Sequence, residues 1–482
     1  MAEVTKKDLR REVPAWWRDA KLGIFVHWTP ASVAGFAPTG DEIGDRLASG
    51  MADALAENPY TEWYANSLRF PGSSAARHHH EVWHDRPYED FADDFRAGLE
   101  QWDPEAWAER FAATGARYVV LVTKHHDGFC LWPSEVTHPD PRWRGWHTGR
   151  DVVGELAEAV RGAGMRFGVY YSGGLDWTFE DRPIGSMADL VLAVPRGDYP
   201  AYADAQVREL IERYRPSVLW NDILWPDRRR PLFRLFADYY RAVPDGVVND
   251  RWMPWHPAMG ALEWAPLQRA ARAATARSAR NDAGLVPPTP PHFDVRTPEY
   301  TTFPDIQRRA WECVRGIDRS FGYNRASDES HFLGRDELVG SLADIAAKGG
   351  NLLLNVGPRG EDAQIPEAQL RRLGWLAEWT AAGDGEALFA TRPWVRPEAT
   401  SPEGHELRFT CRDRTVFAAV VSGPATGPLT VPGVLATPAT TVRLVGGTDL
   451  AFSAEAAGLR VELGGPGDHP VLALDAVDAA PA

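Results

Sequence analysis

Near-continuous apolar runs alternate with segments of helical periodicity over most of the chain. Apolar runs begin at residues 22, 118, 167, 217 and 246, and each is short enough for one strand. Asp103 and Pro104 are residue types that open helices, and Trp107 and Phe111 follow at helical spacing. Strands that are apolar on both faces and alternate with helices are typical of a parallel sheet with right-handed crossovers. The pattern predicts an α/β fold, with further helices at residues 151–160, 202–214 and 230–243.

The strand–helix alternation is interrupted and then resumes. Residues 252–291 contain an Ala/Arg-rich stretch and end in a run of prolines, so we interpret them as an insertion with a short helix. An extended segment follows at 293–300, and residues 311–317 fit either a strand or a helix. A helix at 335–348, a strand at 351–357 and a helix at 366–382 complete the expected barrel. Residues 31–101 are expected to form a long active-site loop.

The texture of the chain changes after Gly385. Short β-type runs alternate with Gly and Pro turns, and helical periodicity is weak. Short strands at this spacing favour a β-sandwich of roughly a hundred residues. We therefore expect two domains, a barrel at residues 1–385 with its insertion at about 252–291, and an all-β sandwich at 386–482.

Charge and composition narrow the class of partner. The 482 residues carry a formal net charge of −15, which argues against nucleic acid or an anionic membrane as a partner. The 20 Trp residues mildly favour a carbohydrate ligand, because indole rings stack on the C–H faces of sugars. No run approaches the roughly 18 apolar residues of a membrane span, and no signal-peptide pattern or disulfide framework is visible. We expect a cytoplasmic protein.

Polar side chains recur just after the predicted strands. In an α/β barrel this position is the mouth, where catalytic groups lie; the side chains in question are His27, His125, Tyr170, Asp222 and Arg251. Asp222 ends a strand-like run, and we interpret it as a nucleophile, the alternative being an Asp that caps the next turn. The chain shows no serine nucleophile elbow, phosphate loop or dinucleotide fingerprint. Two carboxylates at strand ends are the minimum for glycoside hydrolysis.

The adjacent imidazoles of His125 and His126 leave a second interpretation open. Imidazole is the commonest metal ligand, so a metal-dependent barrel hydrolase is one alternative. Metal-dependent barrels usually need a cluster of ligands, and the first strand supplies only His27. Hydrogen bonds to sugar hydroxyls are the simpler use of neutral imidazoles, so we expect no metal and no cofactor.

A set of motifs, in order along the chain, resembles one known family. They include Lys124-His125-His126-Asp127-Gly128-Phe129, Trp220-Asn221-Asp222 and Asn249-Asp250-Arg251-Trp252, with further motifs at residues 23–28, 62–64, 168–172, 320–324 and 350–357. Together they resemble the α-L-fucosidases of glycoside hydrolase family twenty-nine, from about Trp16 to Trp394. Each motif alone is weak, but the ordered set is specific.

The resemblance implies a fold, an activity and a site. It implies a TIM-like (β/α)8 barrel with a C-terminal all-β sandwich, and a retaining, metal-free mechanism with Asp222 as nucleophile. The family's apolar patch for the methyl group of fucose matches Phe25 and Phe321, for which the alternative is plain core packing. Its other sugar-binding positions fall on His27, Glu62, Trp63, His125, His126, Tyr170, Trp220 and Arg251.

The general acid/base is the harder assignment, because its sequence position varies across the family. Arg296-Thr297-Pro298-Glu299-Tyr300 resembles a Thr-x-Glu-Tyr segment of one branch, which indicates Glu299. In that branch the acid closely follows the Asn-Asp-Arg strand, whereas here residues 252–291 intervene. Glu263, inside the insertion, is therefore the rival.

The sequence thus predicts a retaining, exo-acting α-L-fucosidase that releases terminal fucose from fucosylated oligosaccharides or glycoconjugates through a covalent fucosyl-enzyme. The alternatives are a non-catalytic carbohydrate-binding barrel and the metal-dependent hydrolase. A homo-oligomer is possible.

Overall fold

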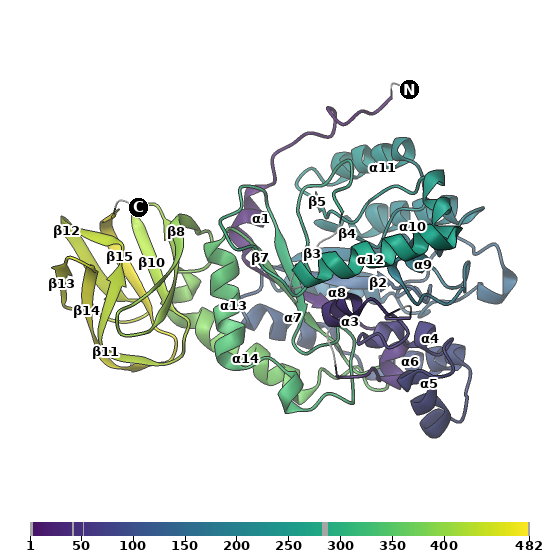
Figure 1. Cartoon of the computed structure of the whole chain (residues 1–482), viewed down its shortest axis with the longest axis horizontal. Coiled ribbons are helices and arrows are strands. Elements are labelled where there is room, and N and C mark those ends of the chain that lie inside the picture. Colours follow the sequence, from purple (N-terminus) through teal and green to yellow (C-terminus); the bar gives the residue numbers. More distant parts are fainter. Residues whose placement is uncertain (1–2, 41–42, 52, 282–287, 481–482) are drawn as a thin grey trace.

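The computed structural model describes residues 3–40, 43–51, 53–281 and 288–480. A helix-covered parallel sheet occupies the N-terminal part of the chain, and antiparallel sheets form the C-terminal part at one end of the molecule (Figure 1). In the described part of the chain, no helix combines the length and the apolar character that crossing a bilayer requires.

Seven parallel strands form the wall of the barrel. They are β1 (Leu22–Val26), β2 (Tyr118–Lys124), β3 (Arg166–Ser172), β4 (Val218–Asp222), β5 (Val247–Val248), β6 (Glu312–Gly316) and β7 (Asn351–Val356). Their order in the sheet is β5-β4-β3-β2-β1-β7-β6, and every pairing is parallel. The predicted parallel α/β architecture is confirmed, β4 ends at Asp222 as expected, and the ambiguous segment at 311–317 is a strand.

An irregular segment closes the barrel between its two edge strands. The backbone N–H groups of Asp294 and Val295 donate to the Val248 carbonyl of β5, at 3.0 and 3.2 Å. On the other side, isolated parallel bridges join Arg296 to Trp311 and Glu299 to Val314. Residues 294–300 therefore take the eighth position of the barrel without forming a regular strand, and they carry Glu299 to its mouth.

Helices cover the outside of this wall (Figure 1). Asp103 begins one of them, because its side chain accepts a hydrogen bond from the Ala106 N–H. The covering helices are α7 (Pro104–Ala113), α8 (Val152–Gly162), α10 (Tyr199–Tyr214), α11 (Arg229–Ala242), α13 (Arg335–Ala347) and α14 (Glu367–Ala381). The short α1 (Ala15–Ala20) instead buries Trp17 against Tyr118 at the start of β2. Each predicted helix is present, within a few residues of its expected bounds.

Short helices lie around the mouth, where long loops were expected. The stretch between β1 and α7 holds α2 (Ala31–Ala34), α3 (Ile43–Ser49), α4 (Tyr64–Ser67), α5 (Ser74–His78) and α6 (Phe91–Gly98). The loop after β3 holds α9 (Met187–Leu192). The predicted insertion contains a 3-10 helix, η6 (Pro257–Glu263), and α12 (Ala265–Asn281), while its residues 282–287 lie outside the described residues.

The C-terminal part is all-β, as predicted. A five-stranded antiparallel sheet has the order β12-β15-β10-β9-β8, and a three-stranded sheet has the order β11-β14-β13. Leu407, Phe409, Leu429, Leu459 and Leu472 share one buried core. The strands are β8 (Arg392–Thr400), β9 (Glu406–Arg412), β10 (Thr415–Val420), β11 (Ala425–Pro432), β12 (Val434–Leu444), β13 (Phe452–Glu455), β14 (Gly458–Gly467) and β15 (Val471–Ala479).

Candidate active site

A cavity of about 250 Å³ opens at the carboxyl ends of the barrel strands. It collects side chains that are far apart in the sequence, from β1, β3, β4, β6, the loop after β2 and the closing segment. All of the predicted site residues except His126 line it: Phe25, His27, Glu62, Trp63, His125, Tyr170, Trp220, Asp222, Arg251, Glu299 and Phe321. This cavity is the candidate active site.

Asp222 is held at the end of β4 by three neighbours. Its Oδ2 accepts a hydrogen bond from the Tyr170 hydroxyl at 2.9 Å, and its Oδ1 accepts one from the Ile223 N–H at 2.8 Å. Arg251 Nη1 lies 3.2 Å from Oδ1. Ile223 has φ of 68°, which a β-branched residue rarely adopts. The chain therefore turns sharply at the point where it presents this carboxylate.

Arg251 joins the two candidate catalytic carboxylates. The same Nη1 atom that contacts Asp222 lies 2.7 Å from Glu299 Oε1. The separation of these two carboxylate oxygens therefore cannot exceed the sum of the two contact distances, which is compatible with the ~5–5.5 Å of a retaining pair. Burial raises the pKa of Glu299, while the nearby Arg251 charge acts in the opposite direction. The structure thus brings together the two groups that the sequence singled out.

Thr297 anchors Arg251 and was not foreseen. Arg251 Nε donates to Thr297 Oγ1 at 3.2 Å, and Nη2 donates to the Thr297 carbonyl at 3.0 Å. Thr297 in turn donates from its N–H and its hydroxyl to Asp250 Oδ1, at 3.0 and 2.7 Å. The end of β5 is thereby tied to the segment that carries Glu299. The only sequence signal for this role was the Thr-x-Glu-Tyr pattern itself.

The three histidines are buried and neutral. Burial lowers the pKa of His27 to about 4 and lowers the pKa values of His125 and His126 well below their usual range. His27 Nδ1 is hydrogen-bonded to Asn355, and His126 Nδ1 to the Ser172 hydroxyl at 2.6 Å. His126 Nε2 lies 3.9 Å from Asp222 Oδ2, and His126 is not among the described residues that line the cavity.

Aromatic rings form the floor of the cavity. Trp220 stacks on Tyr170 with centroids 5.3 Å apart, and Phe25 lies 5.4 Å from Trp220. Phe321 stacks on His27 at 5.0 Å, while Trp63 meets His126 edge-on at 5.2 Å. This floor combines flat apolar faces with imidazole nitrogens, which suits a sugar ring.

Glu62 is a buried carboxyl of a different kind. Its Oε2 accepts a hydrogen bond from the Gly322 N–H at 2.8 Å, and it is 4% exposed. Burial raises the pKa of Glu62 to about 8, so the group is largely protonated at neutral pH. A protonated carboxyl can donate a hydrogen bond to a sugar hydroxyl as well as accept one.

Among the residues that the structure describes, two histidine–carboxylate groups have donor atoms close enough to hold a metal ion. His27, Glu62 and His125 form one, and His125, His126 and Asp222 form the other, each with ligand atoms within 4.8 Å of one another. Neutral imidazole is the form that binds metals and also the form that hydrogen-bonds sugar hydroxyls. The geometry of these groups is compatible both with metal binding and with hydrogen bonds to sugar hydroxyls.

Glu263, the rival acid, lies away from this cavity. It is exposed on η6 and is not among the described residues that line the cavity. Glu299 is 7% exposed and does line it. Position therefore favours Glu299 over Glu263.

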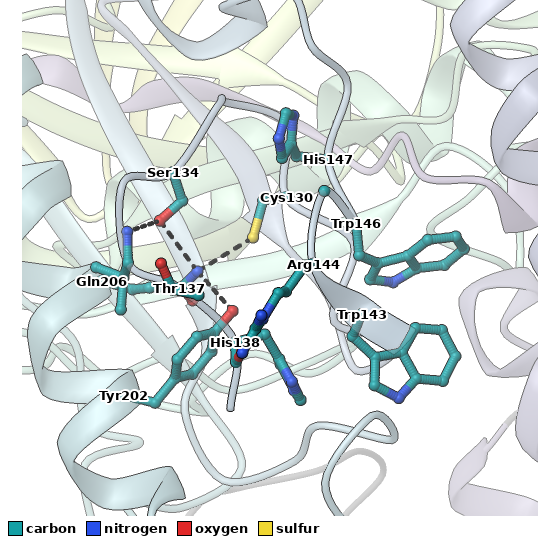
Figure 2. Close-up of a pocket in the computed structure, with 12 residues that line it drawn as sticks. Cys130, Ser134, Thr137, His138, Trp143, Arg144, Trp146, His147, Tyr202 and Gln206 are labelled. Atoms are coloured by element: carbon teal, nitrogen blue, oxygen red, sulfur yellow. Dashed lines mark hydrogen bonds between the residues drawn. The ribbon is translucent and has the colours of Figure 1, made fainter. Parts of the chain in front are cut away.

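A second cavity, of about 280 Å³, lies beside the loop that follows β2 (Figure 2). Figure 2 shows Gln206 and Tyr202 of α10 facing Ser134 and Cys130, and Gln206 Nε2 donates to the Tyr202 hydroxyl at 2.9 Å. The described residues that line it include no carboxylate and none of the predicted site residues. Without a pair of carboxylates among its described lining residues, it is not the candidate active site.

The sequence reasoning missed much of the outer cavity wall. These residues come from α3, α9 and the connecting loops, and they are Ile43, Leu47, Leu55, Asn58, Tyr60, Met187, Leu190, Val191, Ile223 and Leu224. Helices as short as α3 and α9 carry too few turns for a recognisable periodicity. The expected active-site loop at 31–101 included the members from Ile43 to Tyr60 without singling them out, and no signal in the sequence placed α9 beside the site.

Comparisons with known proteins agree with this geometry. The family model described as Alpha-L-fucosidase matches residues 2–384. An alpha-L-fucosidase of Branchiostoma floridae is 30% identical over 459 residues, covering 91% of this chain and 85% of that protein. The human tissue alpha-L-fucosidase is 27% identical over 453 residues, covering 90% of this chain and 81% of that protein.

Solved structures extend the likeness over nearly the whole chain. The Thermotoga maritima alpha-fucosidase in complex with a mechanism-based inhibitor has a TM-score of 0.80 and 37% identity, covering 98% of this chain and 100% of that one. The same enzyme in complex with fucose has a TM-score of 0.79 and 38% identity, with the same coverage. Because the family model spans most of the sequence and the structural likeness spans both parts of the fold, this chain belongs to the alpha-L-fucosidase family.

Proposed function

We propose that Asp222 is the nucleophile and Glu299 the general acid/base of this retaining α-L-fucosidase. The observation that carries the proposal is the shared contact of Arg251 Nη1 with both carboxylates, which lie at the same cavity. The separation of the two carboxylates suits a retaining enzyme, in which one carboxylate attacks the sugar directly. An inverting enzyme needs a wider separation, because a water molecule lies between the base and the sugar.

In the first step, Asp222 attacks the anomeric carbon of a bound α-L-fucoside. Glu299, whose raised pKa favours its protonated form, gives its proton to the departing oxygen. The product is a fucosyl-enzyme ester on Asp222 and a free alcohol. In the second step, Glu299 removes a proton from water, the water attacks the same carbon, and fucose leaves with retained configuration.

The remaining cavity residues orient the sugar. His27, His125 and Glu62 offer hydrogen-bonding atoms to the hydroxyls, and Tyr170 and Arg251 hold Asp222 in place. Phe25 and Phe321 supply the apolar contact that the methyl group of a 6-deoxy sugar requires. His126, whose Nε2 lies 3.9 Å from Asp222 Oδ2, is proposed to act next to the nucleophile. The substrate proposed for this set is a terminal fucosyl group of a glycan.

The proposed location is a reducing compartment such as the cytoplasm. All three cysteines, Cys130, Cys313 and Cys411, are free thiols, and Cys130 and Cys313 are buried. A homo-oligomer and the absence of nucleic-acid partners stay predictions.

The test is a set of three alanine variants assayed on an alkyl and on an activated aryl α-L-fucoside. Asp222→Ala should lose at least about 10⁴-fold in kcat on both, because the nucleophile is gone. Glu299→Ala should lose about 10²–10⁴-fold on the alkyl fucoside and far less on the aryl one, whose leaving group needs no proton.

Azide separates the two candidate acids. It attacks the fucosyl-enzyme without needing a general base, so it should restore turnover of the aryl fucoside by Glu299→Ala. Glu263→Ala is the matched control and should behave like the unmodified enzyme. If Glu263→Ala shows the rescue and Glu299→Ala does not, the assignment of Glu299 is wrong.

A further inference from the structure

One wall of the active-site cavity is apolar. It is built from Ile43 and Leu47 of α3 and from Met187, Leu190 and Val191 of α9. Leu47 and Leu190 are each 7% exposed, and Met187 and Val191 are half-buried. We call these five residues the apolar wall.

The wall lies outside the set of groups that suit the sugar. The hydrogen-bonding side chains of the cavity belong to the strand ends and to the loops directly above them. A fucose hydroxyl placed against the apolar wall would lose its hydrogen bonds to water and find none in return, which is costly. The single methyl group of fucose already has Phe25 and Phe321. The wall therefore suits an apolar group that is attached to the sugar rather than the sugar itself.

The insertion holds this wall in place. α12 packs against both α3 and α9, and Figure 1 shows it lying across the barrel beside them. Ala276 of α12 is 5% exposed and lies against Gly50, at the end of α3. Gln268 Nε2 of α12 donates to Asp189 Oδ1 of α9 at 3.4 Å. Fixing both helices from one side gives the wall a preformed shape.

Resting on the proposed function, we infer that the apolar wall is the leaving-group subsite, and that the chain prefers α-L-fucosides whose aglycone begins with an apolar alkyl or aryl group. The wall and the Asp222–Glu299 pair line the same cavity, so a group on the departing oxygen stays within reach of the wall while Glu299 protonates that oxygen. The insertion packs on α3 and α9 and thereby affects the preference for the leaving group without contacting the sugar.

The test compares kcat/KM for methyl and butyl α-L-fucoside. Both leaving groups are primary or methyl alkoxides of similar basicity, so the demand on Glu299 is the same and the ratio reports contacts with the chain. Each buried methylene is worth up to about fourfold in binding. The butyl compound should therefore exceed the methyl compound by about tenfold. A ratio close to one overturns the inference.

Variants of the wall locate the effect. Leu190→Asn and Leu47→Asn should each lower the butyl-to-methyl ratio by about threefold or more, because a polar side chain replaces part of the apolar contact. Leu435→Asn is the matched control, since Leu435 is 40% exposed on β12, far from the cavity, and should keep the ratio. An unchanged ratio in both folded wall variants also overturns the inference.

Failure of the proposed function would look different. If the chain hydrolyses no α-L-fucoside at all, the catalytic proposal fails, and the wall is then tested by calorimetric binding of the same two compounds. Binding of the butyl compound about tenfold tighter than that of the methyl compound supports the wall, and equal affinities overturn it.

Discussion

At the residue scale, the proposed chemistry depends on the different surroundings of two carboxyl groups, Asp222 and Glu299, that both contact Arg251. Asp222 accepts hydrogen bonds from Tyr170, Arg251 and the Ile223 N–H. Glu299 has its ion pair with Arg251 but is buried, and burial raises its pKa. A raised carboxyl pKa keeps the acid form present to a higher pH than in a free glutamate, which is the property a general acid needs.

This difference predicts the alkaline limb of the pH profile. Because Glu299 must be protonated to act as the acid, kcat/KM for an alkyl fucoside should fall as pH rises through the raised pKa of Glu299. In Glu299→Gln, assayed on the same alkyl fucoside, the limb should be absent from the residual activity because the titrating group is gone. The measurement is kcat/KM against pH for both enzymes.

Glu62→Gln serves as the control for that profile. The pKa of Glu62 is raised to about 8, so it is the other cavity carboxyl that could titrate in this range. The amide keeps an acceptor for the Gly322 N–H and should keep the Glu299 limb. A limb that survives in Glu299→Gln and disappears in Glu62→Gln would reassign the acid group.

Single residues were predictable where a strand end exposes them. Asp222, Tyr170 and His125 follow apolar runs, so both their place and their direction toward the mouth follow from the strand pattern. The bridging role of Arg251 was not predictable, because a contact between two carboxylates and one nitrogen depends on distances across the barrel. Thr297 was missed for the same reason.

At the element scale, a buried ion pair links the end of β2 to the loop that follows β3. Lys124 Nζ lies 2.6 Å from Asp176 Oδ2, and the two side chains are 0% and 1% exposed. Lys124 also donates to the Tyr199 hydroxyl of α10 at 3.3 Å. The N–H of Trp177, next to Asp176, donates to the His126 carbonyl at 2.7 Å. The pair thus fixes the backbone that carries His125 and His126.

Removing one partner of this pair should destabilise the fold strongly. Lys124→Met leaves the charge of Asp176 buried and unpaired, and we expect the free energy of unfolding to fall by about 3–5 kcal/mol. Removing both charges, in Lys124→Met with Asp176→Leu, should cost less than either single change. Denaturant unfolding of the three variants measures this.

The surface pair of Arg142 and Asp140 is the matched comparison. Arg142 Nη2 lies 2.6 Å from Asp140 Oδ2, but the Arg142 side chain is 79% exposed. Arg142→Met should change stability by less than about 1 kcal/mol. Equal losses in Lys124→Met and Arg142→Met would show that burial of the first pair has no energetic consequence.

The sequence predicted whether a segment is a helix or a strand better than it predicted where the element begins and ends. The run at 246–251 was expected to be a strand, but β5 spans only Val247–Val248. The side chain of Asn249 takes over the pairing, because its Oδ1 accepts from the Asn221 N–H at 2.9 Å and its Nδ2 donates to the Asn221 carbonyl at 2.8 Å. The hydrophobic pattern cannot show that a side chain replaces the backbone hydrogen bonds of a strand.

At the scale of the whole molecule, the barrel and the β-sandwich share an interface. Phe417 of β10, 2% exposed, belongs to one buried cluster with Ala343 of α13 and Val445, and Trp379 of α14 packs against it. Arg408 Nε of β9 lies 2.6 Å from Asp344 Oδ1 of α13. The outer helices of the barrel thus depend on the sandwich to cover their apolar faces.

Truncating a side chain at this interface should weaken the whole chain. Phe417→Ala should lower the free energy of unfolding by about 3–5 kcal/mol, because it opens a cavity in the shared cluster. At a temperature where the variant stays folded, kcat/KM should be unchanged, since Phe417 lies far from the site. Denaturant unfolding and a fucosidase assay measure the two effects.

Phe452→Ala is the matched control, as Phe452 is 37% exposed on β13. It should change stability by no more than about 0.5 kcal/mol. Similar losses from both variants would argue that the interface contributes nothing special.

The two-part architecture was visible in the sequence as a change of periodicity, but the interface was not. The clustering of Phe417 with Ala343 joins residues of the two parts, and neither residue differs in kind from an ordinary core residue of its own part. The domain boundary at residue 385 stays a prediction.

The closing segment at residues 294–300 has an evolutionary consequence. The strand of Asp222 is paired on both sides, so one added residue there would turn every following side chain to the opposite face. The segment of Glu299 is held by isolated bridges, and extra chain can accumulate before it without disturbing them. With the roles proposed for Asp222 and Glu299, related chains can therefore keep the nucleophile at a fixed alignment position while the position of the general acid varies. In distant relatives, the general acid should therefore be identified by its position in the barrel wall and not by the residues that flank it in the alignment.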